Sequence, residues 1–210
     1  MKKEVLLTPE ELYFLGRTLQ AKYIDYAYIA AMHDINHNFS LFESETKASL
    51  VAAGILMEDF SGDVEIDKDV LAVLKPIFFG ETETAVDICF IGQQNAISVT
   101  KYHFLDSTIT CVTGKDQKLS IKATDKVEIQ EFLNLLVAED YSAENKFVET
   151  IDKTKITKVF AFKNNFIGKS TSVKTFIEAD GIIYGDKDGK IESVTRDQFI
   201  TDAFNTIKGE

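Results

Sequence analysis

The sequence predicts an α+β protein with two pseudo-symmetric antiparallel sheet-plus-helix halves, preceded by an N-terminal helical, winged-helix-like segment. Three observations predict this class. A strand-cap-helix unit occurs twice, at 118–139 and at 190–210. Apolar residues recur with the 3.6-residue period of helices before residue 86, and with the two-residue period of strands after it. A polar, charged stretch separates the two strand-rich regions.

Each copy of the repeated unit has a short alternating strand, a capping residue and an amphipathic helix. Asp125 with Glu128, and Thr195 with Gln198, have the spacing of a capping box, in which side chains satisfy the free backbone N–H groups at a helix start. We expect both helices to face their sheets through apolar residues: Phe132, Leu133 and Leu136 in the first copy, and Phe199, Ala203 and Phe204 in the second.

These patterns divide the chain into four expected segments. A helical segment with a β-wing packs on the first half, and a linker with a short helix around Glu144–Ile151 leads to the second half. The segments are 1–85, 86–140, 141–157 and 158–210. The expected strands are Val86–Ile91, Ala96–Phe104, Thr108–Val112, Lys118–Lys122, Lys158–Phe162, Val173–Glu178, Ile182–Tyr184 and Lys190–Ser193.

The start of the first segment carries clear helix signals. Thr8 caps a helix that begins at Pro9, and Glu11 completes a capping box. Tyr23–Met32 has the apolar spacing of a second helix. The side chains expected to face inward are Leu12, Leu15 and Leu19 in the first helix, and Ile24, Tyr28 and Ala31 in the second.

The rest of the first segment has the order helix, two-stranded wing, helix. Ser44 is expected to cap a helix over Glu45–Ala53 that Gly54 ends, and residues 55–60 and 64–66 are expected to form a hairpin around Ser61-Gly62. Asp67 then caps a helix over Lys68–Leu74 that Pro76 stops.

The net negative charge of the chain limits the kinds of partner that it can bind. Residues 1–85 carry 7 basic and 15 acidic groups (−8), and residues 86–210 carry 16 and 19 (−3), which together give the net charge of −11. Such a surface repels phosphate backbones, so we expect no nucleic-acid partner.

The sequence has no apolar run of bilayer length and no export signal at its N-terminus, and we expect a cytoplasmic protein without membrane insertion. Cys89 and Cys111 are expected to be buried thiols.

The sequence contains no recognised catalytic, phosphate-binding or metal-binding motif, so we expect no enzymatic activity and no cofactor. His33 and His37 have a spacing that could chelate a metal on a helix, but no third ligand lies nearby, and we interpret them as a helix end. Asp186-x-Asp188-Gly189 lacks the later ligands of a calcium loop and is typical of a hairpin turn.

Three apolar pairs lie near the ends of expected elements, where polar residues are usual. Phe166 and Ile167 lie in a loop, Phe104-Leu105 precedes a turn, and Phe78 and Phe79 follow Pro76. One interpretation is that they pack on their own core. The other is that they form a partner-binding patch, with Phe166 and Ile167 as the anchors.

The order of parts resembles the EspG-type chaperones of type VII (ESX) secretion, or a shorter relative from a Gram-positive type VII locus. The matching features are Leu7-Thr8-Pro9-Glu10-Glu11-Leu12, the helix end Leu50–Leu56 through Gly54, the Gly62-Asp63-Val64 wing, the helix Asp69–Lys75 with Pro76, and the doubled meander and helix. The resemblance implies a cytosolic chaperone that holds a secreted helical-hairpin substrate before export, without turnover, as a monomer or weak homodimer.

Two other classes fit parts of the pattern. An immunity or adaptor protein that binds a toxin domain would also be small and acidic, and its affinity would collapse with salt. A winged-helix regulator would need a basic face in residues 1–85, and the charge of that segment argues against it.

Overall fold

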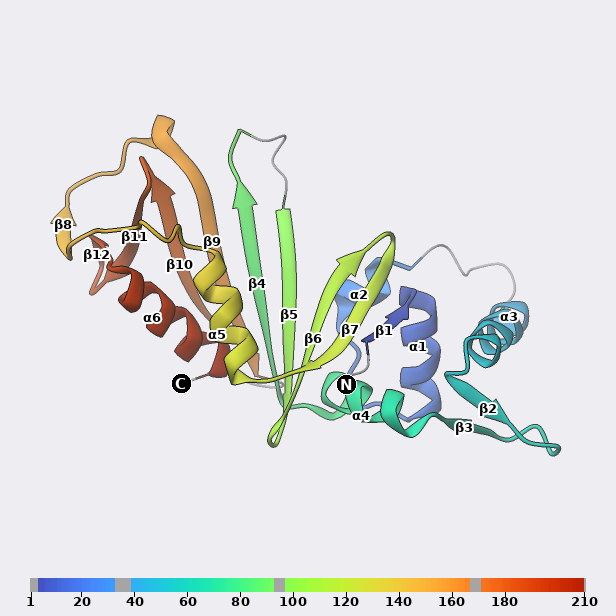
Figure 1. The fold of residues 1–210 in the computed structure, drawn as a ribbon. Helices are drawn as coiled ribbons and strands as arrows, with labels where there is room; N and C mark the ends of the chain where they lie inside the picture. The colour runs from blue at the N-terminus through green and yellow to red at the C-terminus, as the bar shows by residue number, and fades with distance from the viewer. Residues whose placement is uncertain (1–3, 33–38, 93–96, 167–170, 210) are drawn as a thin grey trace. The chain divides into compact units, whose positions relative to one another are not determined.

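The computed structural model describes residues 4–32, 39–92, 97–166 and 171–209. It confirms the predicted α+β class, with helices packed on antiparallel sheet (Figure 1). The chain forms two compact units. Unit 1 consists of Met1–Glu81 and His103–Ala123, and unit 2 consists of Thr82–Tyr102 and Thr124–Glu210.

These units have other bounds than the four segments expected from the sequence. Residues 86–102 of the expected first half belong to unit 2, whereas residues 103–123 belong to unit 1. The expected linker also contributes structure to unit 2. The four-segment division therefore stays a prediction from the sequence repeat.

Unit 1 combines a short antiparallel ladder with four helices. Strand β1 (Glu4–Leu7) pairs with β7 (Lys118–Thr124), and Leu7 lies opposite Leu119. The other elements of this unit are α1 (Pro9–Thr18), α2 (Tyr26–Ala30), α3 (Phe39–Ala52), β2 (Leu56–Glu58), β3 (Val64–Ile66), α4 (Lys68–Phe79) and β6 (Thr108–Lys115).

The capping box of α1 is confirmed. The backbone N–H of Glu11 donates to Thr8 Oγ1 (3.2 Å), and that of Thr8 donates to Glu11 Oε2 (2.8 Å). Leu12 and Leu15 are fully buried, as expected. The second helix is shorter than predicted: α2 covers five residues, and Ala31 is exposed rather than inward.

Two expected helix boundaries in unit 1 are wrong. Ser44 does not cap α3, which begins at Phe39; its hydroxyl donates to Leu41 O (3.0 Å), a bond that a serine makes inside a helix. Pro76 does not stop α4, which continues to Phe79. Proline removes one backbone donor, but burial of Ile77 and Phe78 holds the last turn in the core, and Gly80 N–H donates to Pro76 O (3.0 Å).

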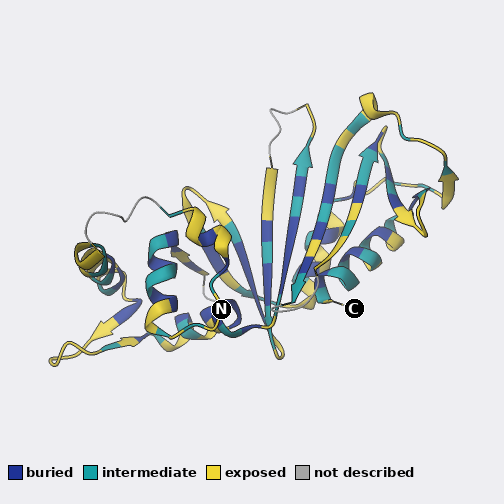
Figure 2. Cartoon of the chain, turned by 180° about the vertical axis from the view of Figure 1, so that it is seen from behind, coloured by how far each residue is buried: buried dark blue, intermediate teal, exposed yellow. Residues whose placement is uncertain are grey.

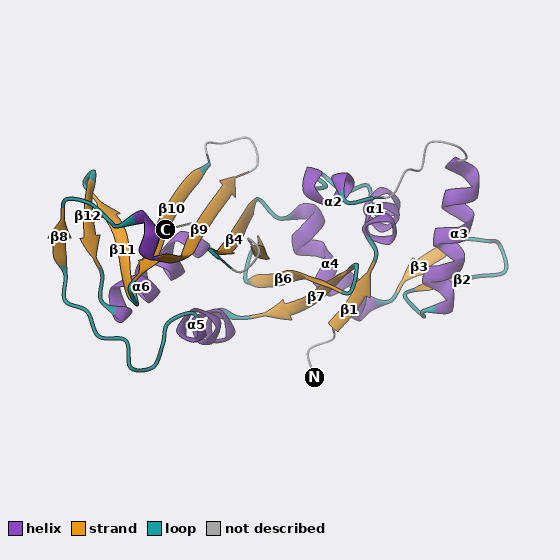
Figure 3. Ribbon diagram, turned by 90° about the horizontal axis from the view of Figure 1, so that it is seen from above, coloured by secondary structure: helices purple, strands orange, loops and turns teal. Residues whose placement is uncertain are grey.

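The predicted hairpin of residues 55–66 is confirmed as β2 and β3, with Met57 opposite Glu65. Leu56 and Ile66 at its base are buried in the unit 1 core. Figure 3 shows this hairpin beside α3. Gly54, with a φ of +67°, ends α3 as predicted.

Unit 2 is an antiparallel sheet with two helices. Its strands pair in the order β4-β9-β10-β11-β12-β8. The strands are β4 (Thr82–Phe90), β8 (Lys146–Val148), β9 (Ile156–Phe166), β10 (Ser172–Ala179), β11 (Ile182–Lys187) and β12 (Lys190–Ser193), and β5 (Ile97–Leu105) lies in unit 2 through Tyr102. Buried and less buried residues alternate along the C-terminal part of β9, whereas β4 buries residues 83–86 in succession (Figure 2).

The two repeat helices are α5 (Lys126–Leu135) and α6 (Arg196–Lys208), and they contact each other. Helix α6 packs on β4, β9 and β10. Asp125 accepts hydrogen bonds from Val127 N and Glu128 N, and Thr195 accepts one from Gln198 N, so both predicted N-caps are confirmed. The predicted inward residues Leu133, Phe199 and Ala203 are fully buried, and Phe132, Leu136 and Phe204 are half-buried.

The helix expected around Glu144–Ile151 is wrong, because this stretch supplies strand β8, which pairs with β12. Side chains fasten the stretch to the sheet. Tyr141 Oη donates to Val194 O (2.6 Å) and accepts from Ile183 N (3.1 Å), while Ser193 Oγ donates to Glu144 O (2.7 Å). Its polar composition reflects a sheet edge, where one side of a strand faces water.

Candidate protein-binding surfaces

The part of the chain that the structure describes contains no group of three or more His, Cys, Asp or Glu side chains placed to hold a metal ion. His33 and His37 lie outside the described residues. The third histidine, His103, is buried, and its Nε2 lies 2.9 Å from the hydroxyl of Tyr28. Among the described helices, none is both long and apolar enough to cross a bilayer.

The structure separates the six residues predicted to bind a partner. Phe78 is fully buried in the unit 1 core, so its predicted place on a partner-facing surface is wrong. Phe79 is half-buried and packs against the same core. Phe104 and Leu105 are half-buried at the end of β5, Phe166 is half-buried at the end of β9, and Ile167 lies outside the described residues.

Gly80 explains why the end of α4 and the end of β5 lie together in unit 1. A Cβ atom at this position would lie 2.3 Å from Pro76 O and 2.5 Å from Phe104 O. Only glycine fits so close to two backbone carbonyls. Phe79 and Phe104 therefore flank one backbone contact within unit 1, and their partial exposure leaves them accessible from the surface.

Phe166 has a different setting, in unit 2. It ends β9 opposite Thr82, and a Cβ atom on Gly209 would lie 2.9 Å from its ring. The adjoining Asn164 is fully buried and donates through Nδ2 to Thr84 Oγ1 (2.9 Å) and Thr206 O (3.1 Å). The end of α6 is thus fixed on β4 and β9, and the half-buried ring of Phe166 lies at that junction.

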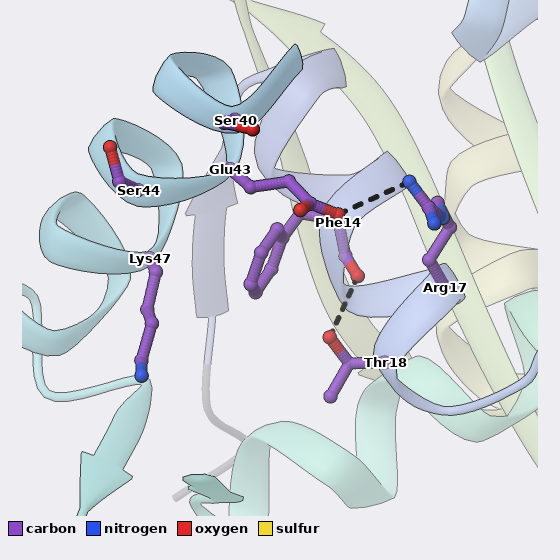
Figure 4. A pocket seen from close by; sticks show the side chains of 7 residues that line it. All are labelled: Phe14, Arg17, Thr18, Ser40, Glu43, Ser44 and Lys47. Carbon is purple, nitrogen blue, oxygen red and sulfur yellow. Dashed lines mark hydrogen bonds and ion pairs between the residues drawn. The ribbon is translucent and has the colours of Figure 1, made fainter. Parts of the chain in front are cut away.

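A groove between α1 and α3 is a further candidate surface in unit 1 (Figure 4). It encloses about 500 Å³. Arg17 spans it, because its guanidinium donates to Glu43 Oε1 (3.2 Å) and lies 4.7 Å from the ring centroid of Phe39. The lining residues are Phe14, Arg17, Thr18, Ser40, Glu43, Ser44 and Lys47.

Helix α3 contacts α1 near both of its ends. Glu11 is buried, and its Oε1 accepts a hydrogen bond from Ser49 Oγ (2.7 Å) near the C-terminal end of α3, where Leu50 is also buried. Near the other end, where Arg17 contacts Glu43 and Phe39, Phe39 and Leu41 are still 42% and 50% exposed. Apolar surface therefore stays open at the N-terminal end of α3.

The wing, defined as residues 56–66, exposes two apolar side chains that the sequence analysis did not select. Phe60 is fully exposed at the tip, and Met57 is 52% exposed on β2. The available signal was Phe60 itself, since an aromatic residue directly before a Ser-Gly turn has little core to reach.

A buried ion pair lies in the unit 2 sheet, at the start of β4. Lys101 Nζ donates to Glu83 Oε1 (3.1 Å). Burial raises the pKa of Glu83 to about 7, although a hydrogen bond with Asn165 opposes the shift. Burial also lowers the pKa of Lys101 to about 8, and the nearby Lys163 adds to this shift. Both groups can therefore titrate close to neutral pH, but no metal-binding cluster is present among the described residues.

No protein-family model matches the sequence, and no curated protein matches it. Among the solved structures that are similar to this chain is that of the Mycobacterium tuberculosis type VII secretion system chaperone EspG5, in complex with the PE25–PPE41 dimer. The similarity covers 98% of this chain and 96% of that chain, with a TM-score of 0.61 and 8% sequence identity. At this identity the likeness concerns the fold alone. The chain therefore has a fold similar to that of EspG5.

Proposed function

We propose that this chain is a non-catalytic cytosolic chaperone or adaptor that holds a helical protein before its export by a type VII secretion system. One observation carries the proposal: the fold is similar over 98% of the chain to a secretion chaperone whose structure contains its protein partners. The resemblance of the sequence elements to the EspG type agrees with it.

A chaperone of this kind only binds the exported protein and releases it, and it catalyses no reaction. An exported helical hairpin with an apolar tip would aggregate or pair wrongly in the cytosol. A chaperone covers that tip with apolar side chains of its own and releases it at the export machinery. The net charge of −11 would keep the complex in solution.

The partner-facing residues that we propose are Phe166 and Ile167 in unit 2, with Phe79, Phe104 and Leu105 in unit 1. The half-buried rings among them are suited to this role, because they offer apolar area while their positions are fixed by the core. Phe166 is the strongest candidate, since its ring lies beside the fixed end of α6.

The test begins with a tagged chain recovered from the cytosol of its native host, with bound proteins identified by mass spectrometry. We expect a helical protein that is exported, and whose export falls when the chaperone gene is deleted. Changing Phe166 and Ile167 to Ser should lower the affinity for that protein at least tenfold, about 1.4 kcal/mol, with an unchanged melting temperature. Val127→Ser, at a 62% exposed position on α5, is the control.

The acidic surface also favours a second candidate, an adaptor that binds the basic cleft of a toxin domain. The salt dependence of the affinity for the partner distinguishes the two functions. An apolar tip stays bound when salt is raised from 0.05 to 0.5 M, whereas a complex dominated by charge loses most of its affinity. Recovery of a toxin with that salt response, and of no exported helical protein, would contradict the chaperone proposal.

A further inference from the structure

The wing presents an aromatic side chain that its own fold does not use. Phe60 has a relative exposure of 112%, greater than that of any other large apolar side chain reported for the described residues. Water is an unfavourable environment for such a ring, and the cost is recovered only when another surface covers it. Met57, 52% exposed, lies on the same hairpin.

The turn that carries Phe60 is ordered by hydrogen bonds. Asp59 Oδ1 accepts from Ser61 N (2.9 Å) and Asp63 N (3.0 Å), and Ser61 Oγ lies 2.6 Å from the same carboxylate oxygen. The backbone N–H of Asp59 donates to Asp63 O (3.0 Å). Gly62 takes a φ of +87°, which allows the chain to reverse. The ring is therefore held on a preformed turn, which lowers the entropy lost on binding.

The wing is also fastened at its side and at its base. Lys47 of α3 donates to Glu58 Oε1 (2.7 Å) and to Gly62 O (3.2 Å). At the base, Leu56 and Ile66 are buried, and Asp67 N–H donates to Ile55 O (2.9 Å). The hairpin thus projects from the unit 1 core with a defined direction relative to α3.

Charge on the wing selects the kind of partner. The wing contains four acidic residues and no basic residue: Glu58, Asp59, Asp63 and Glu65. The hydrogen bond from Ser61 lowers the pKa of Asp59, so this carboxylate stays charged at neutral pH. Glu65 is exposed and takes no part in the bonds of the turn. Phe60 is consequently an apolar tip on a hairpin with net negative charge, where Lys47 pairs with one of the four carboxylates, that of Glu58.

We propose that the wing is a docking finger whose Phe60 enters an apolar pocket rimmed by lysine and arginine side chains on a protein partner. Complementary charge would speed encounter and fix the register, and the buried ring would supply most of the affinity. An anionic membrane surface and a second copy of this acidic chain would both repel the finger. The proposal goes beyond the proposed function, because it assigns a second contact surface with its own chemistry.

The test places a photocrosslinking residue at the tip of the full-length chain in its native host. Phe60→p-benzoylphenylalanine should form a light-dependent adduct with one protein, at a peptide that contains or adjoins Lys or Arg. The same residue placed at Val127 is the control for an exposed position elsewhere. With the identified partner purified, Phe60→Ser should weaken binding at least tenfold at every salt concentration and leave the melting temperature unchanged.

Charge is tested separately at Glu65. Glu65→Lys should weaken binding at low salt and flatten its salt dependence, and replacing the crosslinked basic residue of the partner by Glu should restore affinity to this variant. Glu131→Gln on α5, also at an exposed acidic position, should change neither quantity. Rescue by the exchanged charges supports the proposed pairing. An acidic or uncharged crosslinked site, or unchanged binding by Phe60→Ser, overturns it.

The two proposals can fail independently. If the exported protein binds but neither crosslinks to position 60 nor depends on Phe60, and no other adduct forms, the chaperone function stands and the docking finger is wrong. If position 60 captures a basic-rimmed partner that is never exported, the finger stands and the chaperone function is wrong. A dimer of this chain, or an adduct with lipid only, contradicts the finger as proposed.

Discussion

Helices α5 and α6 begin with similar local sequences, but unit 2 buries them to different extents. Both have a confirmed N-cap, at Asp125 and Thr195. Helix α6 is 13 residues long and buries Phe199, Ala203 and Ile207, whereas α5 is 10 residues long and buries Ile129 and Leu133. Leu135 at the end of α5 is 84% exposed. The capping residue determines where each helix begins. The strands beneath each helix determine how much of the helix surface is buried.

The difference in burial arises from the side chains that each helix contacts on the sheet. Phe199 of α6 packs on three fully buried phenylalanines, with ring centroids 5.3 Å from Phe160, 6.1 Å from Phe162 and 4.9 Å from Phe176. Among the described residues, α5 contributes one ring contact, in which Phe132 lies 6.4 Å from Tyr102, beside the buried aliphatic side chains of Ile129 and Leu133. Helix α6 therefore covers the core of unit 2, and α5 lies at its border.

The largest effect is expected from Phe199→Ala. Removing this ring leaves a cavity among three aromatic side chains, and the change should lower the free energy of unfolding by about 3–5 kcal/mol. Denaturant melts of the variant and the wild type measure it. A loss below about 1 kcal/mol would mean that α6 does not cover the aromatic cluster.

Leu133→Ala tests the other helix. Leu133 is fully buried, but α5 covers less of the sheet and can settle after truncation, so we expect a smaller loss of about 2–3 kcal/mol. Equal losses for Leu133→Ala and Phe199→Ala in the same melts would show that the two helices contribute alike, and would break the comparison.

The pH dependence of the free energy of unfolding tests the charged pair on the strands β4 and β5. Glu83 lies on β4 next to Thr84, whose hydroxyl donates to Ile207 O of α6, and its partner Lys101 lies on β5 next to Tyr102, whose ring meets Phe132 of α5. The pKa of Glu83 is raised from 4.5 to about 7, so the folded protein binds this proton more tightly than the unfolded chain does. Stability from this group is therefore fully present below pH 4.5 and is lost as the pH rises through about 7, by about 3 kcal/mol.

Unfolding free energies of the wild type and of Glu83→Gln, measured from pH 4.5 to 7.5, test this dependence. The wild type should lose stability relative to the variant across that window. A parallel pH response of the two proteins would contradict the raised pKa.

The smallest effect is expected from Leu135→Ser. This side chain is 84% exposed at the end of α5, so the free energy of unfolding should change by less than about 0.5 kcal/mol. Phe204 on α6 is half-buried, and Phe204→Ser should cost more. Chemical denaturation of both variants gives the contrast, and a large loss for Leu135→Ser would show that α5 packs on something through that face.

Local signals in the sequence were sufficient for much of the fold. Thr8 and Glu11 form the predicted capping box, Ser61-Gly62 turns the predicted hairpin, and Thr195 caps α6, as expected. Each of these features is decided by residues within a few positions of one another. Such interactions can be derived from spacing alone.

Features decided by distant residues could not be derived in this way. Strand β4 pairs with β9, so that Val86 lies opposite Phe162, and β8 adds to β12, yet nothing near Lys146 in the sequence announces a strand. Pro76 stays helical because the core holds Ile77 and Phe78. Tertiary packing overrides local preference in these places.

The candidate surface was the least predictable part. Apolar residues near element ends were selected by pattern, but pattern does not show that Phe78 reaches the core while Phe60 does not. The difference depends on geometry: α4 turns Phe78 toward Leu74 and the other core residues, and the hairpin carries Phe60 away from them.

The interleaved bounds of unit 1 affect its synthesis on the ribosome. Strand β1 pairs with β7, placing Glu4 opposite Lys122, so the unit cannot close until residue 123 has been made. The first stretch of unit 1 ends at Glu81, 42 residues earlier (123 − 81), and translation at about 5–20 residues per second takes roughly 2–8 s to cover them. During that interval the apolar residues of β1 have already been made but still lack their partner strand β7, and they are open to contacts with other chains.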